Sequence, residues 1–375
     1  MKVLLVENYE FDGSTSMHVW AGALLRELRQ YGIDVQRIAP KPLFGKVKPS
    51  AHGLGKWLGY IDRFVIFPRQ LRTEAAQTDI VHLCDHGSAV YMPMLKGKPV
   101  VATCHDMIGV RRARGELPGL RSSPFGPLQQ RWICKGLQRV TRVACVSRAT
   151  FDDARRILGD EKNLCIILNG LNYPFQLLPA GEADRRLAGW RVIQASFVLH
   201  LGSNVAHKNR EGVLRIFAKA AAKTNLQLVI AGEALDRNLT RLARELQIDD
   251  RIVQVVKPDV GLIEALYNRA LSLLFPSRYE GFGWPPIEAQ ACGCPVVASD
   301  IPPLVEVLGH SAALRPVEDE AGMAEVIRKL ATDREYREQM RESGFENVRS
   351  RFQTARMIGE YISLYQELAV APETL

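Results

Sequence analysis

The sequence predicts an α/β protein of two domains, each a parallel sheet covered by helices on both faces. The chain has 375 residues, which is more than one ordinary core uses and suits two domains. Short apolar runs rich in Val, Ile and Leu alternate with amphipathic stretches along its whole length, as buried parallel strands alternate with crossover helices. The pattern breaks around residues 171–194, where prolines and Gly181 interrupt it.

The strand-like runs fall into two groups, so the pattern of a Rossmann-like domain occurs twice. The first group is "KVLLVE", "DVQRIA", "DIVHLC", "PVVATCHD", "RVACVS" and "LCIILNG". The second is "SFVLHLG", "LQLVIAG", "RIVQVV", "LSLLFP", "PVVAS" and "AALRP". We expect the first domain over residues 1–180 and the second over 190–350. The amphipathic stretch "TARMIGEYISLYQELAV" belongs to no strand, and we expect a C-terminal helix over 352–375 to complete the first domain.

Composition narrows the class of protein. The chain is 47% hydrophobic and 24% charged, which excludes disordered and fibrous proteins. No run approaches the roughly 20 apolar residues of a membrane span, and the start "MKVLLVENYE" fits a first strand better than a signal peptide. The seven cysteines, an odd number, lie mostly in apolar runs and are expected to be buried reduced thiols. These features predict a cytoplasmic protein.

Basic residues are concentrated in the first half of a chain whose formal net charge is +8. The segment 41–72 holds seven basic residues and one acid, with apolar side chains at helical spacing: Trp57, Leu58, Ile61, Phe64 and Val65. Such a helix could lie on an anionic bilayer, which would make the protein peripheral on the inner face of the membrane. It could equally face the core and leave a solvated basic side. No nucleic-acid motif accompanies the charge, so no nucleic-acid partner is expected. A second basic cluster, "RRAR" at 111–114, is expected to be a loop.

The stretch "SRYEGFGWPPIEAQACGCP", residues 277–295, places two acids on either side of a glycine turn. Glu280 follows the strand-like run "LSLLFP", and Glu288 lies beyond two prolines that suit the first turn of a helix. Gly281 and Gly283 allow a tight turn and a close approach of the backbone to a ligand. The stretch therefore predicts a strand, a turn and a helix that meet at the ligand-binding edge of a sheet.

This turn predicts an anion site. The amides of Phe282, Gly283 and Trp284 and the positive end of the following helix should point at a phosphate. Carboxylates would repel a phosphate unless they face neutral hydroxyls, so the expected ligand is a nucleotide-sugar. Glu288, placed in the first helical turn, would accept from the ribose, and Glu280 would accept from the hexose. The alternative is a plain turn whose Glu288 only favours the helix dipole.

These residues resemble glycosyltransferase family four, a retaining family of the GT-B fold with a Glu-seven residues-Glu motif. The resemblance covers nearly the whole chain. It rests on "SRYEGFGWPPIEAQACGCPVVASD" and, in family order, on "CHD", "SRATFDDARRILG", "IILNG", "HLGSNVAHKNREGVLRIFAKA" and "LVIAGE". It implies two Rossmann-like domains that face each other across a deep cleft, with a nucleotide-sugar bound in the cleft.

The resemblance also implies a phosphate-binding lysine. Lys208 is similar to the family's lysine, a cation that lowers the barrier as charge develops on the departing diphosphate. Gly202 and Ser203 precede it on the same loop and are expected to contact the donor. Ser203 stands where the family often has an arginine, so the second phosphate ligand is left open.

Two residues of the first half complete the expected site. Gly13 resembles the family's glycine loop near the phosphate, although a helix N-cap by Ser14 or Ser16 explains the same pattern. His105 ends a strand, is similar to a family histidine near the reaction centre, and is expected to serve catalysis together with Glu280.

The resemblance thus implies a retaining, metal-independent hexosyltransferase without a cofactor. It is most similar to mannosyltransferases, so the favoured donor is GDP-mannose and the favoured acceptor a polyprenyl-diphosphate-linked glycan or a polysaccharide. A UDP-sugar is the alternative donor. A nucleotide-sugar epimerase or hydrolase of the same fold, and a non-catalytic subunit, are the alternative functions.

Overall fold

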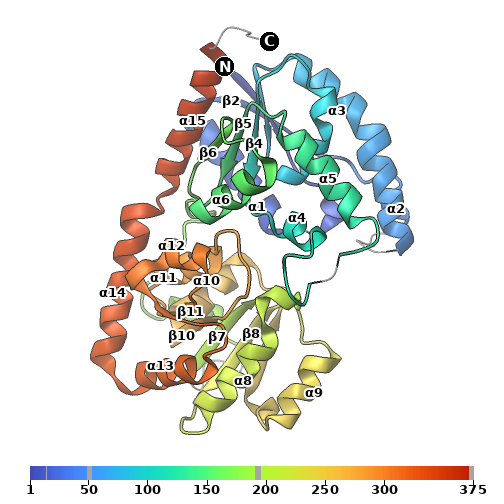
Figure 1. Ribbon diagram of the computed structural model, residues 1–375. Helices are drawn as coiled ribbons and strands as arrows, with labels where there is room; N and C mark the ends of the chain where they lie inside the picture. Colours follow the sequence, from blue (N-terminus) through green and yellow to red (C-terminus); the bar gives the residue numbers. More distant parts are fainter. Residues whose placement is uncertain (14, 49–52, 121, 191–195, 371–375) are drawn as a thin grey trace. The chain divides into compact units, whose positions relative to one another are not determined.

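The computed structural model describes residues 1–13, 15–48, 53–120, 122–190 and 196–370. Contacts divide the chain into two compact units. Unit 1 comprises residues 1–173 and 354–375, and unit 2 comprises residues 174–353. Each unit is an α/β structure with its own sheet (Figure 1).

Unit 1 contains a six-stranded parallel sheet in the order β2-β1-β3-β4-β5-β6. Its strands are β1 Lys2–Val6, β2 Asp34–Ile38, β3 Ile80–Leu83, β4 Val100–Cys104, β5 Arg142–Cys145 and β6 Leu164–Ile166. β3 and β4 are buried along their whole length, because helices cover both faces of the sheet. The helices are α1 Thr15–Gln30, α2 Gly53–Ile61, α3 Phe67–Ala76, α4 Ile108–Ala113, α5 Gly126–Leu137, α6 Arg148–Leu158 and α15 Thr354–Val370.

Unit 2 contains the second six-stranded parallel sheet, in the order β12-β11-β10-β7-β8-β9. Its strands are β7 Phe197–Gly202, β8 Gln227–Gly232, β9 Ile252–Val256, β10 Ser272–Phe275, β11 Val296–Ser299 and β12 Ala313–Arg315. Its helices are α7 Glu182–Arg186, α8 Arg210–Ala221, α9 Arg237–Glu245, α10 Val260–Arg269, α11 Trp284–Ala291, α12 Pro302–Leu308, α13 Glu320–Thr332 and α14 Arg334–Arg351. One core cluster joins α8, α9 and α13 to the sheet.

All twelve strand-like runs form strands, so this part of the sequence prediction is confirmed. The expected loop at 111–114 is wrong, because residues 108–113 form the helix α4. In parallel sheets the carboxyl ends of the strands share one edge, and the loops that leave this edge carry the predicted site residues.

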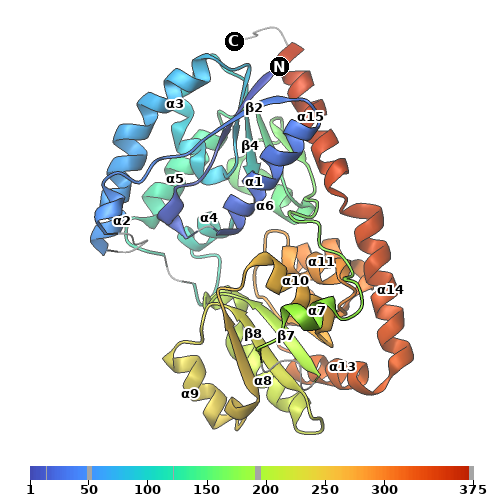
Figure 2. The ribbon, with the colours of Figure 1, turned by 180° about the vertical axis from the view of Figure 1, so that it is seen from behind.

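The last helix, α15, packs on unit 1 beside α1 and β3 (Figure 2). A buried chain of polar contacts fixes it there. His82 on β3 contacts the Tyr365 hydroxyl at 2.5 Å and Thr103 Oγ1 at 2.8 Å, and Thr103 contacts the Tyr361 hydroxyl at 2.9 Å. Both ring nitrogens of His82 thus take part in contacts that attach α15 to the sheet.

Candidate donor site

The predicted donor residues of unit 2 lie on two loops that leave neighbouring strands. Gly202 is the last residue of β7, Ser203 begins the loop that follows, and Lys208 ends a short 3-10 turn in the same loop. Glu280 lies in the loop after β10, which pairs with β7. Strand pairing therefore brings together residues that are more than 70 positions apart in the chain.

Hydrogen bonds to backbone carbonyls connect these two loops to each other. The Arg278 amide donates to the His207 carbonyl at 2.8 Å, and Asn209 Nδ2 donates to the Pro276 carbonyl at 2.9 Å. Asn209 has a φ of 54°, in the left-handed region that asparagine tolerates better than most residues. The loops therefore form one ordered surface, and the sequence did not single out Asn209 as their connection.

Lys208 and Glu280 form an ion pair across this surface. Lys208 Nζ lies 2.7 Å from Glu280 Oε1, and the two side chains are only 19% and 9% exposed. Lys208 Nζ also lies 5.1 Å from the centroid of the Phe275 ring, within cation–π distance. The sequence assigned the two residues to different parts of a ligand; the structure shows that they contact each other.

Arg210 is a residue of this site that the sequence analysis missed. Its guanidinium is buried and donates to the Gly202 carbonyl at 2.6 Å, the Glu233 carbonyl at 2.7 Å and Asn204 Oδ1 at 2.6 Å. These bonds join the loops after β7 and β8. The sequence signal was only an arginine at the start of an amphipathic helix, which is typical of solvated positions.

The glycine turn has the predicted order of strand, turn and helix. Gly283 adopts a φ of 102°, and a Cβ there would lie 2.6 Å from Leu304 Cδ2, so a larger residue would be strained. The side chains of Phe282 and Trp284 are buried and form an edge-to-face ring pair. Gly281 belongs to the same turn. Within the described residues the backbone amides of Phe282 and Gly283 make no hydrogen bond. Because the Phe282 side chain is buried, any contact of Phe282 with a ligand would come from its backbone.

The position of Glu288 differs from the expectation. α11 begins at Trp284, so the first turn holds no acid and Glu288 begins the second turn. The carboxylate is buried, and Oε2 accepts a hydrogen bond of 3.0 Å from the Tyr267 hydroxyl. Burial, followed by the charge of Glu288, raises the pKa of Tyr267 well above its usual value, so the phenol stays a donor. Tyr267, on α10, thus orients Glu288; nothing in the local sequence marked it.

His105 lies in unit 1, directly after β4. It is buried, its Nε2 lies 2.9 Å from the Cys84 carbonyl, and its ring packs edge-to-face on Trp20 with 5.0 Å between centroids. A carbonyl only accepts, so Nε2 carries the proton and Nδ1 is the acceptor of the neutral ring. Burial lowers the pKa of His105, which keeps the ring neutral near pH 7.

Gly13 follows β1 and has a φ of 82°, a conformation that favours glycine. It ends the short 3-10 turn Glu10–Asp12 and is exposed. Of the two alternative helix caps, Ser14 lies outside the described residues, and Ser16 lies inside α1, which begins at Thr15.

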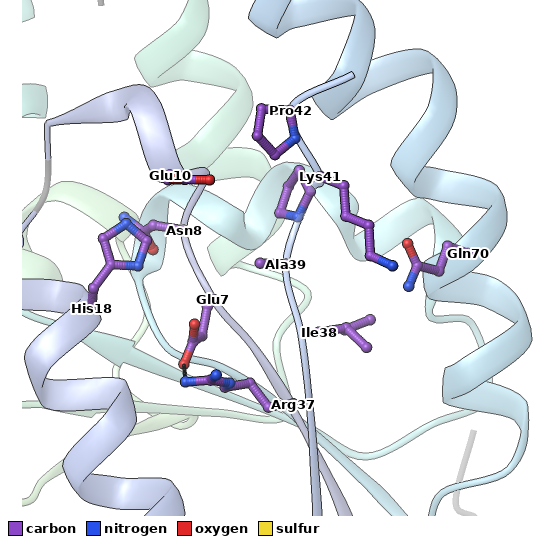
Figure 3. Close-up of a pocket in the computed structure, with 11 residues that line it drawn as sticks. Glu7, Asn8, Glu10, His18, Arg37, Ile38, Ala39, Lys41, Pro42 and Gln70 are labelled. Carbon is purple, nitrogen blue, oxygen red and sulfur yellow. Dashed lines mark hydrogen bonds and ion pairs between the residues drawn. The ribbon is translucent and has the colours of Figure 1, made fainter. Parts of the chain in front are cut away.

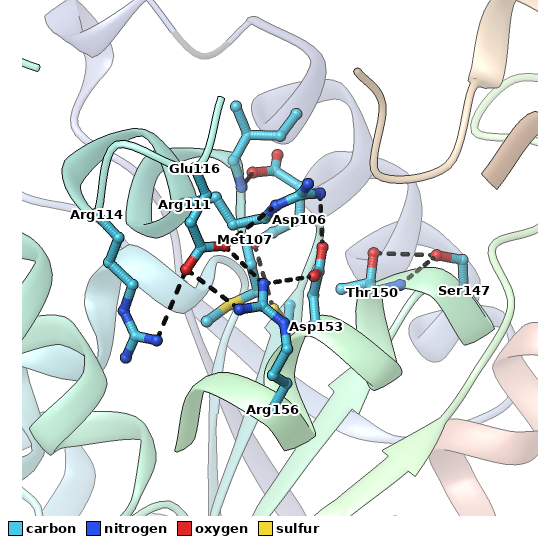
Figure 4. A network of polar contacts seen from close by, with 11 residues as sticks. Asp106, Met107, Arg111, Arg114, Glu116, Ser147, Thr150, Asp153 and Arg156 are labelled. Carbon is cyan, nitrogen blue, oxygen red and sulfur yellow. Dashed lines mark hydrogen bonds and ion pairs between the residues drawn. The ribbon is translucent and has the colours of Figure 1, made fainter. Parts of the chain in front are cut away.

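The arginines of "RRAR" take part in a network of ion pairs (Figure 4). Arg111 lies 3.0 Å from Asp153, and Arg114 lies 3.9 Å from Glu116. Arg156 on α6 donates to both oxygens of Glu116, at 3.1 and 2.7 Å. Acids thus offset the positive charge of this cluster.

Lys208 and Glu280 contact each other at the loop edge of a parallel sheet, and the helix that follows the same glycine turn carries the buried carboxylate of Glu288. These are the parts of a site for an anionic ligand that carries hydroxyl groups, in a protein of the doubly wound α/β class. Residues 17–173 match the model "Glycosyltransferase Family 4", and residues 194–347 match the model "Glycosyl transferases group 1". The chain belongs to this family of glycosyltransferases.

Individual relatives agree with the family. An O-antigen chain mannosyltransferase of Salmonella typhimurium is 30% identical over 36% of this chain and 38% of its own length. An N-acetyl-alpha-D-glucosaminyl L-malate synthase of Bacillus anthracis is 28% identical over 62% of this chain and 61% of its own length. The match thus spans less than two thirds of each of these relatives.

Solved structures agree with the fold. A sucrose-phosphate synthase from Thermosynechococcus elongatus superposes with a TM-score of 0.79 at 18% identity, over 98% of this chain and 99% of that one. The expected GT-B fold is confirmed. No helix among the described residues is both long and apolar enough to cross a bilayer.

Proposed function

We propose that the protein is a retaining glycosyltransferase that moves a hexose from a nucleotide diphosphate sugar to an acceptor hydroxyl. One observation carries the proposal. The Lys208–Glu280 ion pair, with a spacing of 2.7 Å, lies on ordered loops between β7 and the glycine turn before α11. In this arrangement a cation for phosphate and a carboxylate for a sugar hydroxyl are held next to each other.

The donor's diphosphate would lie against Lys208 and the amides of Phe282 and Gly283, with Gly202 and Ser203 lining the same loop edge. Glu288, oriented by Tyr267, would accept from the ribose hydroxyls. Glu280 would accept from a hydroxyl of the hexose. Because Lys208 and the N-terminus of α11 provide positive charge to the diphosphate, the reaction is proposed to proceed without a metal ion.

In the proposed reaction the acceptor oxygen attacks the anomeric carbon on the face from which the diphosphate departs. The bond between that carbon and the phosphate oxygen breaks, and the acceptor's proton passes to the departing phosphate oxygen. Glu280 stabilises the hexose without forming a covalent bond. His105 and Gly13 are proposed to serve the same reaction from unit 1.

GDP-mannose is the proposed donor, supported by the similarity to the O-antigen mannosyltransferase. A UDP-sugar is the alternative donor, since the similar N-acetyl-alpha-D-glucosaminyl L-malate synthase is named for a sugar other than mannose. A polyprenyl-diphosphate-linked glycan or a polysaccharide is the proposed acceptor.

The acceptor is proposed to be anchored in a bilayer to which unit 1 binds, because unit 1 exposes apolar side chains on segments that also carry exposed basic residues. On α2 and the turn that follows it, Trp57 is 59% exposed and Val65 is 63% exposed. Phe125, just before α5, is 70% exposed, and its ring centroid lies 6.4 Å from that of Trp57. The same parts of the chain, segment 41–72 and α5, carry the exposed cations Lys46, Lys48, Arg69 and Arg131. Residues 49–52 of the expected membrane segment lie outside the described residues.

Substitution of the two acids tests the proposed function. Replacing Glu288 by Ala should weaken nucleotide binding about tenfold or more, because a charge-assisted hydrogen bond to the ribose is lost. Replacing Glu280 by Ala should mainly lower kcat. Calorimetry with GDP and UDP, and product formation with and without EDTA, measure both. The exposed Glu245 on α9, replaced by Ala, is the control. Unchanged binding and turnover in both variants would remove the assignment.

A further inference from the structure

Unit 1 contains a cavity of about 540 Å³ that none of the predicted site residues lines (Figure 3). It lies beyond the carboxyl ends of β1 and β2. Its walls come from the last two residues of β2, from the residues that follow β1 and β2, from His18 on α1 and from Gln70 on α3. Its volume falls in the range of about 300–1,000 Å³ that is usual for small-molecule sites.

The floor of the cavity carries a partly buried ion pair. Glu7 is 9% exposed, and its Oε1 lies 3.4 Å from a guanidinium nitrogen of Arg37, whose side chain is half exposed. Arg37 also lines the cavity, and its side chain makes no other hydrogen bond or ion pair among the described residues, so it has further donors for a ligand. The charge of Glu7 is thereby matched within the protein.

Unpaired polar groups lie on two sides of the cavity. Asn8 Oδ1 and His18 Nε2 are covered and have no hydrogen-bond partner among the described residues, and Glu10 lies beside them in Figure 3. Lys41 and Gln70 lie on the other side, and within the described part of the chain Lys41 forms no ion pair. Buried polar atoms without partners are rare in folded proteins, so this wall has hydrogen-bonding capacity for an occupant.

We propose that the cavity is a subsite for an anionic saccharide. The sugar hydroxyls would bind Glu10, Asn8 and His18, and a phosphate or carboxylate on the sugar would bind Lys41 and Arg37. Carboxylates and amides accept from hydroxyls, and two cations suit a single anionic group. The inference deepens and rests on the proposed function, since the saccharide would belong to the acceptor. Glu10 begins the turn that Gly13 ends, so the subsite adjoins the loop assigned to the reaction.

Direct binding to the full chain, without any donor, tests the subsite. Calorimetry or ligand-observed NMR would compare glucose, glucose 1-phosphate, glucuronate and inorganic phosphate. We expect one of the two anionic sugars to bind at least tenfold more tightly than glucose, and the comparison identifies whether phosphate or carboxylate is preferred. Inorganic phosphate that binds as tightly as glucose 1-phosphate would overturn the proposal, because it would show an anion site without sugar recognition.

Two variants locate the binding. Replacing Lys41, which is exposed, by Ala should raise the Kd of the anionic sugar about tenfold, the loss expected for one charge-assisted hydrogen bond. Replacing Gln70 by Ala should weaken binding as well. Lys96, an exposed lysine of unit 1 that does not line the cavity, is the matched control when replaced by Ala. Equal effects of Lys41→Ala and Lys96→Ala would overturn the proposal.

Nucleotide binding in the same samples separates this inference from the proposed function. If GDP or UDP binds and Glu288→Ala weakens it, while no anionic sugar binds, the subsite is wrong and the donor site stands. If the sugar binds through Lys41 and no nucleotide binds, the proposed transferase function fails and the cavity remains a saccharide site.

Discussion

Arg210 is buried although it carries a charge, and no carboxylate lies within ion-pair distance of it among the described residues. Its partners are carbonyl and amide oxygens of the loops after β7 and β8. Burial lowers the pKa of its guanidinium from a very high starting value. The side chain therefore positions the loop that carries Ser203 and Lys208, and we do not expect it to touch the ligand.

We predict that Arg210→Ala lowers the free energy of unfolding by about 2–4 kcal/mol, because several buried oxygens lose their donors. It should also weaken nucleotide binding at temperatures where the variant is still folded, since the loop is no longer held. Thermal unfolding and calorimetry measure the two effects. Arg241, whose side chain is 72% exposed, serves as the control when replaced by Ala. If the Arg210→Ala variant has a lower melting temperature but binds GDP or UDP like the wild type, Arg210 stabilises the fold without positioning the donor loop.

At the scale of elements, the attachment of α15 depends on His82. This imidazole is fully buried between β3 and the helix, and burial lowers its pKa from 6.5 to about 3. In an unfolded segment the ring would take up a proton near pH 6.5, while in the folded unit it stays neutral. Between these values the unfolded state binds more protons, so stability must fall as the pH falls.

We predict that α15 is most firmly attached above pH 6.5 and loosens as the pH drops from there towards 3. For one such group the free energy of local unfolding falls by at most about 1.4 kcal/mol per pH unit. Hydrogen exchange of the α15 amides at pH 7.5, 6 and 5 measures it. Tyr365→Phe should weaken the attachment at every pH and keep the slope, whereas His82→Gln should reduce the slope. An unchanged slope in His82→Gln would contradict this account.

At the scale of the whole molecule, the concentration of positive charge in the first half of the chain predicts binding to an anionic bilayer. The side chains of Trp57, Val65 and Phe125 are exposed apolar groups of unit 1. Among the described residues the exposed cations of the same segments form no ion pair, unlike those of "RRAR". Binding of these residues to a bilayer is stabilised by burial of the apolar side chains and by electrostatic attraction to anionic lipid, and salt screens the attraction.

We predict binding to vesicles that contain anionic phospholipid, weaker binding to neutral vesicles, and release as salt rises from 0.05 to about 0.5 M. The double substitution of Trp57 and Phe125 by Ser should lower the partition coefficient about tenfold or more. Co-sedimentation with vesicles measures it. Val256, an exposed apolar residue of unit 2, replaced by Ser, is the control. If the double variant and the control bind vesicles equally well, Trp57 and Phe125 do not contribute to membrane binding and this prediction is wrong.

The sequence by itself determined the strands, their alternation with helices and the glycine turn. These features depend on neighbours along the chain: apolar runs, helical periodicity, and the positive φ of Gly283. The same local evidence located Glu280 and Lys208 on loops and Glu288 on a helix, although it placed Glu288 one helical turn too early.

Only the tertiary structure decided how those residues are paired. Lys208 contacts Glu280, which is 72 positions away in the sequence, and His82 contacts Tyr365, which is 283 positions away. Glu288 accepts a hydrogen bond from Tyr267 on another helix. Likewise, the cavity beside Glu7 and Arg37 exists because β1 and β2 are neighbours in the sheet. Contacts of this kind depend on strand order and packing, which no pattern of adjacent residues encodes.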